Sequence, residues 1–190
     1  MRPLARNIEL KVRCDAEQLA AVERRLIDTG HVLVNLHQTD TYLHASHGRL
    51  KVREIHALDG NTVELISYAR PDELGTRLSD YRRVAIDREQ GAALLAALRA
   101  SLGEVVVVEK ARRVVIVGRT RVHLDRVAGL GHFVELETVL ADGEDEEAGR
   151  AESREVASLL GIEGLTPIAG SYSDLLLSSA VSGGAVDAHR

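Results

Sequence analysis

Charged and apolar residues alternate along several segments of this chain, and that alternation limits the folds that it can adopt. Successive side chains of a β-strand point to opposite faces, so each such segment predicts a strand with one charged and one apolar face. The apolar faces are aliphatic, as at Ile8, Val52 and Leu136. The charged faces carry Glu9, Lys11 and Arg13; Arg49, Lys51 and Arg53; Lys110 and Arg112; His123 and Asp125; and Glu135 and Glu137.

The whole pattern predicts an α+β domain of about nine mostly antiparallel strands and a few helices. A first helix is expected over residues 15–29, with Asp15 as its N-cap and Gly30 as its stop. Further helices are expected at 89–102, from 142–147 onward and at 175–177. One domain should span residues 1–178, followed by a disordered tail at 179–190. The strands are expected at 7–13, 31–41, 49–56, 62–69, 82–87, 104–111, 113–118, 120–125 and 132–139.

Two architectures can satisfy strands with one charged and one apolar face. The first is a closed barrel with a charged lumen and with helices packed on its apolar outside. The second is an open sheet that carries helices on one face and a solvated charged surface on the other. The barrel explains better why acidic and basic residues lie largely on different strands, so we expect the barrel.

The segment 122–138 reads as a strand, a glycine turn and a second strand. Glu135 and Glu137 lie two residues apart and point to the same side of the second strand, and Asp125 lies on the first strand. Two adjacent carboxylates repel each other unless a cation lies between them. Because the neighbouring residues are apolar, the segment predicts a buried divalent-metal site, with a half-exposed edge strand as the alternative.

The basic rows on the other strands match a polyanion. Arginine offers a planar fork to phosphate oxygens, and lysine offers a compact point charge. Mg²⁺ binds through one or two carboxylates together with substrate phosphates. Bases facing acids therefore predict a polyphosphate site with Mg²⁺ or Mn²⁺, although any one basic residue could be an ordinary surface charge. Tyr172 is placed either in this pocket or in a helix cap.

Composition excludes several classes of function. The net charge is −5 and aromatic residues make up 3% of the chain, which argues against nucleic-acid binding. No apolar run approaches the ~20 residues that cross a membrane, and no signal peptide is visible. The single cysteine, Cys14, fits a reducing compartment. We expect a cytoplasmic protein that binds neither nucleic acid nor membrane; the oligomeric state stays open, with a homodimer among the options.

The ordered motifs resemble the CYTH superfamily, the triphosphate tunnel metalloenzymes that include class IV adenylate cyclases and thiamine triphosphatases. The resemblance covers residues 5–178 and is greatest to the class IV cyclase branch. It is carried by Asn7-Ile-Glu-Leu-Lys11, Gly48-Arg-Leu-Lys-Val-Arg53, Tyr68-Ala-Arg-Pro-Asp72, Glu109-Lys-Ala-Arg112, Leu124-Asp125, Gly129-Leu-Gly131, Phe133-Val-Glu-Leu-Glu137 and Ser171-Tyr-Ser-Asp174.

The resemblance implies an eight-stranded antiparallel tunnel that binds a triphosphate and a divalent metal. It implies metal binding by Glu9, Asp125, Glu135 and Glu137, and catalytic roles for Lys11, Asp125, Glu135 and Glu137. The family's first strand usually reads Glu-x-Glu-x-Lys, and Asn7 replaces the first Glu, so a second metal would be held less tightly. The implied substrate-binding residues are Lys11, Arg13, Arg49, Lys51, Arg53, Arg70, Lys110, Arg112 and Tyr172.

The expected activity is adenylate cyclisation, which converts ATP into cyclic AMP and pyrophosphate. A triphosphatase that hydrolyses inorganic triphosphate, or an organic one such as thiamine triphosphate, is the first alternative. A non-catalytic protein that binds polyphosphate or nucleotide is the second. Sequence does not separate the two enzymes, because the grip on the phosphates is shared and the outcome depends on which oxygen lies in line with phosphorus.

Overall fold

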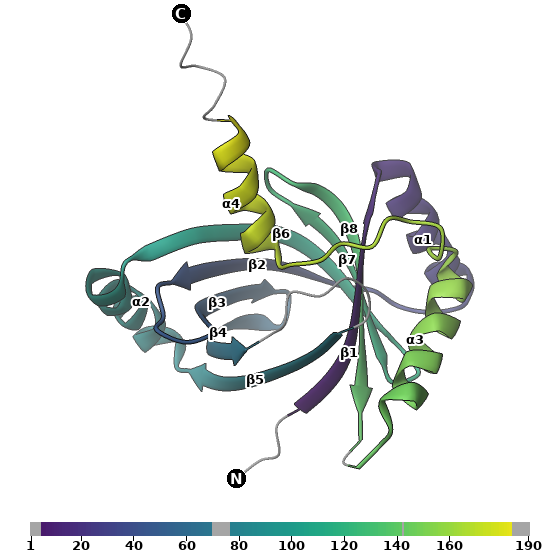
Figure 1. Ribbon diagram of the computed structural model, residues 1–190, viewed down its shortest axis with the longest axis horizontal. Helices are drawn as coiled ribbons and strands as arrows, with labels where there is room; N and C mark the ends of the chain where they lie inside the picture. Colours follow the sequence, from purple (N-terminus) through teal and green to yellow (C-terminus); the bar gives the residue numbers. More distant parts are fainter. Residues whose placement is uncertain (1–4, 70–76, 142, 184–190) are drawn as a thin grey trace, which may run out of the picture.

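Eight antiparallel strands form a closed barrel in the computed structural model, which describes residues 5–69, 77–141 and 143–183 (Figure 1). Going round the barrel the strand order is β1-β5-β4-β3-β2-β6-β7-β8, and β1 closes the ring by pairing with both β5 and β8. The barrel expected from the charge pattern is confirmed. The strands are β1 (Ala5–Cys14), β2 (Val34–Leu43), β3 (Arg49–Ala57), β4 (Gly60–Ala69), β5 (Arg77–Ile86), β6 (Glu104–Val117), β7 (Thr120–Val127) and β8 (Gly131–Leu140).

Strand β6 is one continuous strand where the sequence pattern predicts two. The predicted break near residue 112 falls between Ala111 and Arg113, and both residues keep their pairing with β2 on one side and β7 on the other. No glycine, proline or asparagine stands there to turn the chain. The merged strand reduces the expected nine strands to eight.

Among the described residues, four helices cover the barrel or its end: α1 (Ala16–Asp28), α2 (Arg88–Leu102), α3 (Glu146–Leu160) and α4 (Tyr172–Gly183). Helix α1 begins as predicted, because the Asp15 side chain accepts a hydrogen bond from the Gln18 backbone N–H and the Gln18 side chain bonds back to Asp15. None of the described helices is both long enough and apolar enough to span a membrane.

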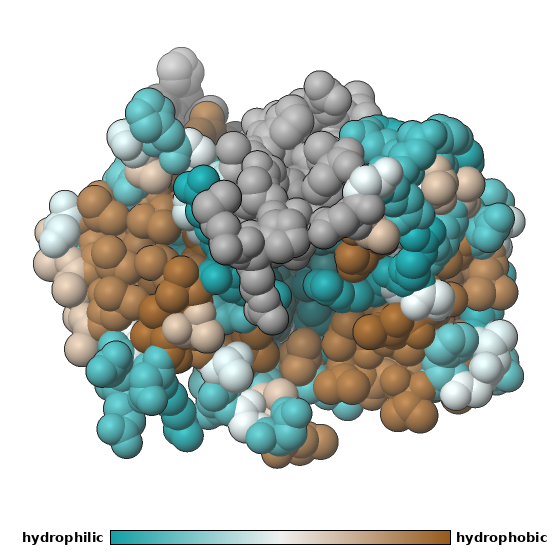
Figure 2. Space-filling model, turned by 90° about the horizontal axis from the view of Figure 1, so that it is seen from below, coloured by the Kyte–Doolittle hydropathy of each residue, from teal (hydrophilic) through white to brown (hydrophobic). Residues whose placement is uncertain are grey.

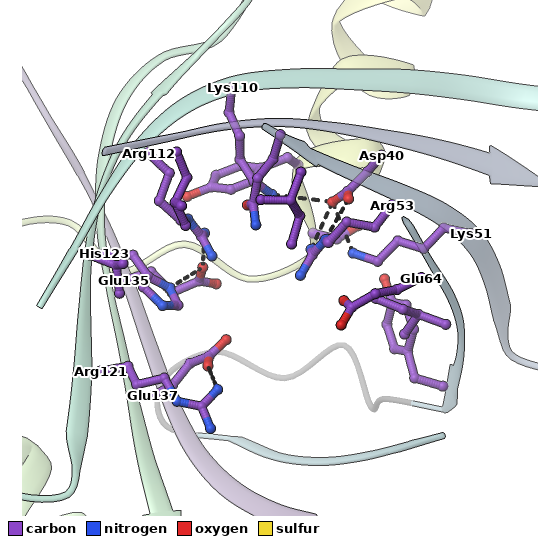
Figure 3. A pocket seen from close by; sticks show the side chains of 18 of the residues that line it. Asp40, Lys51, Arg53, Glu64, Lys110, Arg112, Arg121, His123, Glu135 and Glu137 are labelled. Carbon is purple, nitrogen blue, oxygen red and sulfur yellow. Dashed lines mark hydrogen bonds and ion pairs between the residues drawn. The ribbon is translucent and has the colours of Figure 1, made fainter. Parts of the chain in front are cut away.

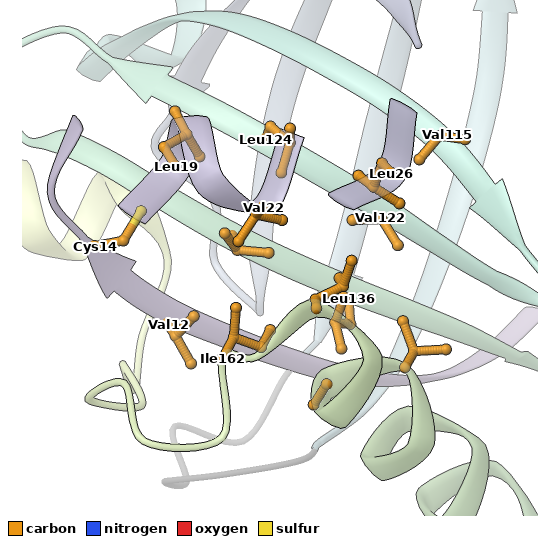
Figure 4. Close-up of a cluster of buried hydrophobic side chains, with 14 residues drawn as sticks. Val12, Cys14, Leu19, Val22, Leu26, Val115, Val122, Leu124, Leu136 and Ile162 are labelled. Carbon is orange, nitrogen blue, oxygen red and sulfur yellow. The ribbon is translucent and has the colours of Figure 1, made fainter. Parts of the chain in front are cut away.

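The main core lies outside the barrel, between its aliphatic outer face and helices α1 and α3 (Figure 4). Leu19, Val22 and Leu26 of α1 lie at helical spacing and are buried against this face. The barrel contributes residues such as Leu124 and Leu136. A smaller core packs Leu95 of α2 on β3 and β4. Burial of the outer face leaves the charged face of each strand pointing inward.

Helix α4 packs at one end of the barrel (Figure 1). Tyr172 packs there with Phe133 and with Tyr42 of β2, all three buried. The helix runs to Gly183, well beyond the short helix predicted at 175–177 and into the predicted tail. It is longer because Leu175 and Leu176 pack on this apolar cluster, while the serines and alanine that follow do not break a helix.

Two helical glycines mark where helices approach the barrel closely. A Cβ on Gly149 of α3 would lie 2.4 Å from Leu140 Cδ2 and 3.1 Å from Ile8 Cγ1. A Cβ on Gly91 of α2 would lie 2.8 Å from Val63 Cγ2. Because these two glycines have no side chain, α3 and α2 can lie close to the barrel, although glycine weakens a helix.

We expect Gly149→Ala to destabilise the protein. On the exposed face of a helix, replacing glycine by alanine raises the free energy of unfolding by about 0.5–1 kcal/mol. Here the overpacking cost of about 1–3 kcal/mol should exceed that gain. Chemical denaturation of the variant and of Ser101→Ala, at an exposed position of α2, gives the comparison; a more stable Gly149→Ala protein would contradict the close approach.

Candidate functional site

The inward faces of the strands enclose a chamber of about 280 Å³ (Figure 3). Glu135 and Glu137 of β8 lie on one side of its open space, and Asp40, Lys51, Arg53 and Glu64 lie across from them. Aromatic side chains of Tyr42, Tyr68 and Tyr172 also line it. The described residues of its lining include seven cationic side chains and five carboxylates: Lys11, Lys51, Arg53, Arg83, Lys110, Arg112 and Arg121 with Glu9, Asp40, Glu64, Glu135 and Glu137.

Asp40 of β2 holds three of these cations together. Lys51 Nζ lies 3.0 Å and Lys110 Nζ 3.2 Å from Asp40 Oδ2, while Arg53 Nε donates to Oδ1 at 2.6 Å. Burial favours a raised pKa for Asp40, but the charges of Arg53, Lys110 and Lys51 outweigh it and hold the pKa well below its usual value. The carboxylate therefore stays ionised and holds the side chains of Lys51, Arg53 and Lys110 in place.

Lys110 is the least compensated member of this group. Burial lowers the pKa of Lys110 to about 7, opposed by Asp40 and reinforced by the nearby charges of Arg112, Arg53 and Lys51. An anion entering the chamber would favour the charged form. Lys110 is thus poised to take up a proton when an anion binds.

A second network joins β6, β7, β8 and α4. Arg112 donates to both oxygens of Asp125, at 2.7 and 2.6 Å, and its NH2 also lies 2.8 Å from Glu135 Oε2. The Tyr172 hydroxyl donates to Asp125 Oδ2 at 2.7 Å. Asp125 is fully buried and does not line the chamber. It lies behind Arg112 and fixes the direction of the guanidinium.

Glu135, like Asp40, has three side-chain partners among the described residues, one of which is Arg112. Lys11 Nζ lies 3.1 Å from Glu135 Oε1, and His123 Nδ1 lies 3.5 Å from Oε2. Burial favours a raised pKa for Glu135, but Lys11, the hydrogen bond from His123 and Arg112 hold it well below its usual value. A substrate that draws Lys11 or Arg112 away would leave this carboxylate free to bind a cation.

One group among the described residues has metal-binding geometry: ligand atoms of His123, Glu135 and Glu137 all lie within 4.8 Å of one another. Glu9, on the neighbouring strand, is paired in register with Glu137 and also lines the chamber. Carboxylate oxygens suit Mg²⁺ and Mn²⁺, and imidazole suits softer divalent ions. The residues present therefore fit a divalent cation held by His123, Glu135 and Glu137.

Two buried acceptors in the chamber have no hydrogen-bond partner among the described residues, namely Gln38 Oε1 and Glu64 Oε2. Arg83 NH1 lies 3.6 Å from the other oxygen of Glu64. Buried polar atoms are nearly always paired with protein, water or a ligand. These two atoms mark places for a ligand's hydrogen-bond donors.

Most residues predicted for the site do lie together. The chamber brings together Glu9, Lys11, Lys51, Arg53, Lys110, Arg112, Glu135, Glu137 and Tyr172. Tyr172 serves both the pocket and the helix, since its ring lies 4.2 Å from Lys11 Nζ and it is the first residue of α4.

Three predicted residues lie elsewhere, and one cannot be placed. The Asp125 carboxylate is taken up by Arg112 and Tyr172, as described above. Arg13 is exposed, donates to the Leu130 carbonyl at 2.8 Å and stacks on Phe133, because its place on β1 lies level with the apolar end of the barrel. Arg49 bonds Ser171 and Asp174 at the start of α4. Arg70 lies outside the described residues.

Several lining residues were missed by the sequence pattern. Asp40 and Gln38 lie on a strand that mixes polar and apolar residues on both faces, so no alternation singled them out. Glu64 is the one charged residue of β4, and Arg83 follows Arg82 on β5, so neither stands out as part of a charged face. His123 was placed on a charged face without a role. The signal available for Asp40 was its spacing of two from both Gln38 and Tyr42, which puts all three on one face.

The low pKa of Lys110 predicts pH-dependent anion binding. Below pH 7 Lys110 is charged and above it is neutral, so affinity for inorganic tripolyphosphate should fall by up to about tenfold per pH unit above 7. Lys110→Arg keeps the charge at every pH and should remove this dependence. Calorimetric titration without metal at pH 6, 7 and 8 makes the test. Because the ligand's own ionisation affects both proteins alike, identical pH profiles for both would exclude a titrating Lys110.

Known proteins share this fold. A family model described as the CYTH domain matches residues 5–172, whereas no curated protein matches the chain. The PH1012 protein of Pyrococcus horikoshii OT3 superposes with a TM-score of 0.71 at 20% identity, covering 89% of this chain and 98% of that chain.

Two further structures carry names that refer to an activity. A candidate adenylate cyclase from Vibrio parahaemolyticus has a TM-score of 0.65 at 21% identity over 90% of this chain and 97% of that chain. A candidate adenylyl cyclase from Hippeastrum, described as having a dominant triphosphatase activity, has a TM-score of 0.65 at 15% identity over 93% and 96%. At these identities the structures establish a shared fold, and the family match over most of the sequence establishes that the chain belongs to the CYTH domain family.

Proposed function

We propose that this protein is a divalent-metal-dependent enzyme that acts on a triphosphate, and that its specific activity is the cyclisation of ATP to cyclic AMP and pyrophosphate. The observation that carries the proposal is the chamber, in which Lys51, Arg53, Lys110 and Arg112 surround a space faced by Glu135 and Glu137. Family membership and the activities named for the Vibrio and Hippeastrum proteins add support.

The basic side chains would bind the phosphates while keeping their carboxylate partners. Each of these cations already faces a carboxylate, and the N–H donors that the carboxylate does not use would bind the phosphate oxygens. Arg53 and Arg112 offer planar forks that are held in place by Asp40 and Asp125. We therefore assign Asp125 the role of positioning Arg112.

Glu135 and Glu137, with His123 and Glu9 beside them, would hold the metal. When bound, the metal would neutralise charge on the phosphoryl oxygens and favour attack on phosphorus. Lys11 Nζ lies 3.1 Å from Glu135 Oε1, so its ammonium would bind a phosphate oxygen that comes to lie beside this carboxylate.

In the proposed cyclisation the ribose 3′-oxygen attacks the α-phosphorus of ATP. A bond forms between these two atoms, the bond from the α-phosphorus to the α,β-bridging oxygen breaks, and the hydroxyl proton is released. Lys51, Arg53 and Lys110 would hold the β- and γ-phosphates and stabilise the charge that develops on pyrophosphate. The chain thus supplies orientation and charge stabilisation.

Hydrolysis is the second candidate, because the same grip can place water in line with the γ-phosphorus. The dominant triphosphatase activity named for the Hippeastrum protein supports hydrolysis as a candidate. A protein that binds nucleotide without turnover is the rival outside the enzyme classes. The three differ in what is released from ATP: cyclic AMP and pyrophosphate, phosphate, or nothing.

Product analysis decides between them. We expect purified protein with ATP and Mn²⁺ to release cyclic AMP and pyrophosphate in equal amounts, resolved by ion-exchange chromatography. Phosphate and ADP in place of these products would identify a triphosphatase. Tight binding of ATP and tripolyphosphate with no turnover of either would exclude both enzymes.

The metal assignment is tested by Glu137→Gln. The variant keeps the size and a carbonyl ligand of Glu137 but loses its charge, so we expect at least an about 100-fold loss of turnover and weaker Mn²⁺ binding. Glu109→Gln, on the exposed face of β6, is the matched control and should retain activity. Full activity in Glu135→Gln and Glu137→Gln alike would refute the role of these carboxylates.

A further inference from the structure

On three of its strands the lining of the chamber changes from polar or charged to aliphatic toward the end that lies away from α4. On three neighbouring strands a polar inward residue is followed, two positions farther from α4, by an apolar inward residue. Leu36 follows Gln38 on β2, Ile55 follows Arg53 on β3, and Val114 follows Arg112 on β6. Because these strands are adjacent in the order β3-β2-β6, the three side chains form one continuous surface, here called the apolar arc.

Exposure rises along the same direction, so this end is the mouth of the chamber. On β6 the exposed fraction is 3% at Lys110, 5% at Arg112 and 63% at Ile116. On β2 it is 3% at Gln38 and 52% at Val34. Figure 2 shows hydrophilic atoms inside a hollow with hydrophobic atoms along its lower border. Val34 and Ile116 lie two residues beyond Leu36 and Val114 on the same faces, so these half-exposed side chains extend the apolar arc outward.

Glu64 lies beside the apolar arc on the next strand. It is paired in register with Arg53, and its neighbour on the same face of β3 is Ile55. Its buried Oε2 has no hydrogen-bond partner among the described residues. The mouth thus combines an aliphatic surface with a carboxylate oxygen ready to accept a hydrogen bond.

We propose that this mouth binds the organic group of the substrate, with the apolar arc against a ring face and Glu64 accepting from a hydroxyl. The inference rests on the proposed function. It adds that the apolar arc and Glu64 select an organic triphosphate over inorganic tripolyphosphate. Inorganic tripolyphosphate has phosphates for the basic group but nothing to cover Leu36, Ile55 and Val114. An organic ring with attached hydroxyls satisfies both parts of the mouth.

Replacing one aliphatic side chain of the arc tests the assignment. Val114→Thr keeps the shape and adds a hydroxyl, and Val84→Thr makes the same change at an exposed position on the outside of β5 as a control. Calorimetry without metal measures the Kd of each protein for ATP and for tripolyphosphate. We expect Val114→Thr to raise the Kd for ATP by about tenfold and to change the Kd for tripolyphosphate by less than about twofold. Val84→Thr should change neither Kd.

The proposal would be overturned if Val114→Thr raised the Kd for ATP and the Kd for tripolyphosphate equally. It would also be overturned if neither Val114→Thr nor Leu36→Thr changed the Kd for ATP. Thermal melting of each variant separates a loss of fold from a loss of binding. Because the readout is binding, selective loss of ATP supports the apolar arc even if product analysis finds no turnover. A failure of the proposed activity is therefore distinct from a failure of this inference.

Glu64→Leu gives an independent test of the polar part. The comparison is between ATP and 2′,3′-dideoxy-ATP, which lacks both ribose hydroxyls but has the same base and phosphates. We expect the wild-type preference for ATP to shrink at least about fivefold in Glu64→Leu. An unchanged ratio would show that Glu64 does not contact the hydroxyls.

Discussion

Compensation of buried charge is the constraint on which this fold depends. A closed barrel with an apolar outside must put its polar side chains inside, where an isolated ion is costly. Asp40 meets this requirement for Lys51, Arg53 and Lys110, and Asp125 meets it for Arg112. Without these two acids the cations could not be held in the chamber before a ligand arrives.

The two acids differ from Glu137 in how they are bonded. Asp40 and Asp125 are each bonded by one arginine, Arg53 and Arg112 respectively, in two-point contacts. Glu137 has one described partner, Arg121, at 3.3 Å. The oxygens of Glu137 are thus less fully bonded than those of Asp40, Asp125 and Glu135.

The period-two pattern was sufficient to predict the barrel and most of its lining, because a strand's two faces follow from spacing alone. It placed Lys11, Lys51, Arg53 and Lys110 correctly. It could not give depth, so Arg13, on the same face as Lys11, was assigned to a site that its position on β1 does not reach. It also missed Asp40, whose role depends on cations 11, 13 and 70 residues away in the sequence.

The packing of α4 against one end of the barrel has a consequence for the order of events. Phe133, Tyr42 and Tyr172 are buried together at that end, so we expect ligands to enter and leave by the opposite end, the mouth. A molecule that enters phosphate-first would have to leave in reverse. Under the proposed reaction the cyclic product, being nearer the mouth, departs before the pyrophosphate beneath it. Free pyrophosphate should then compete directly with ATP for the empty enzyme.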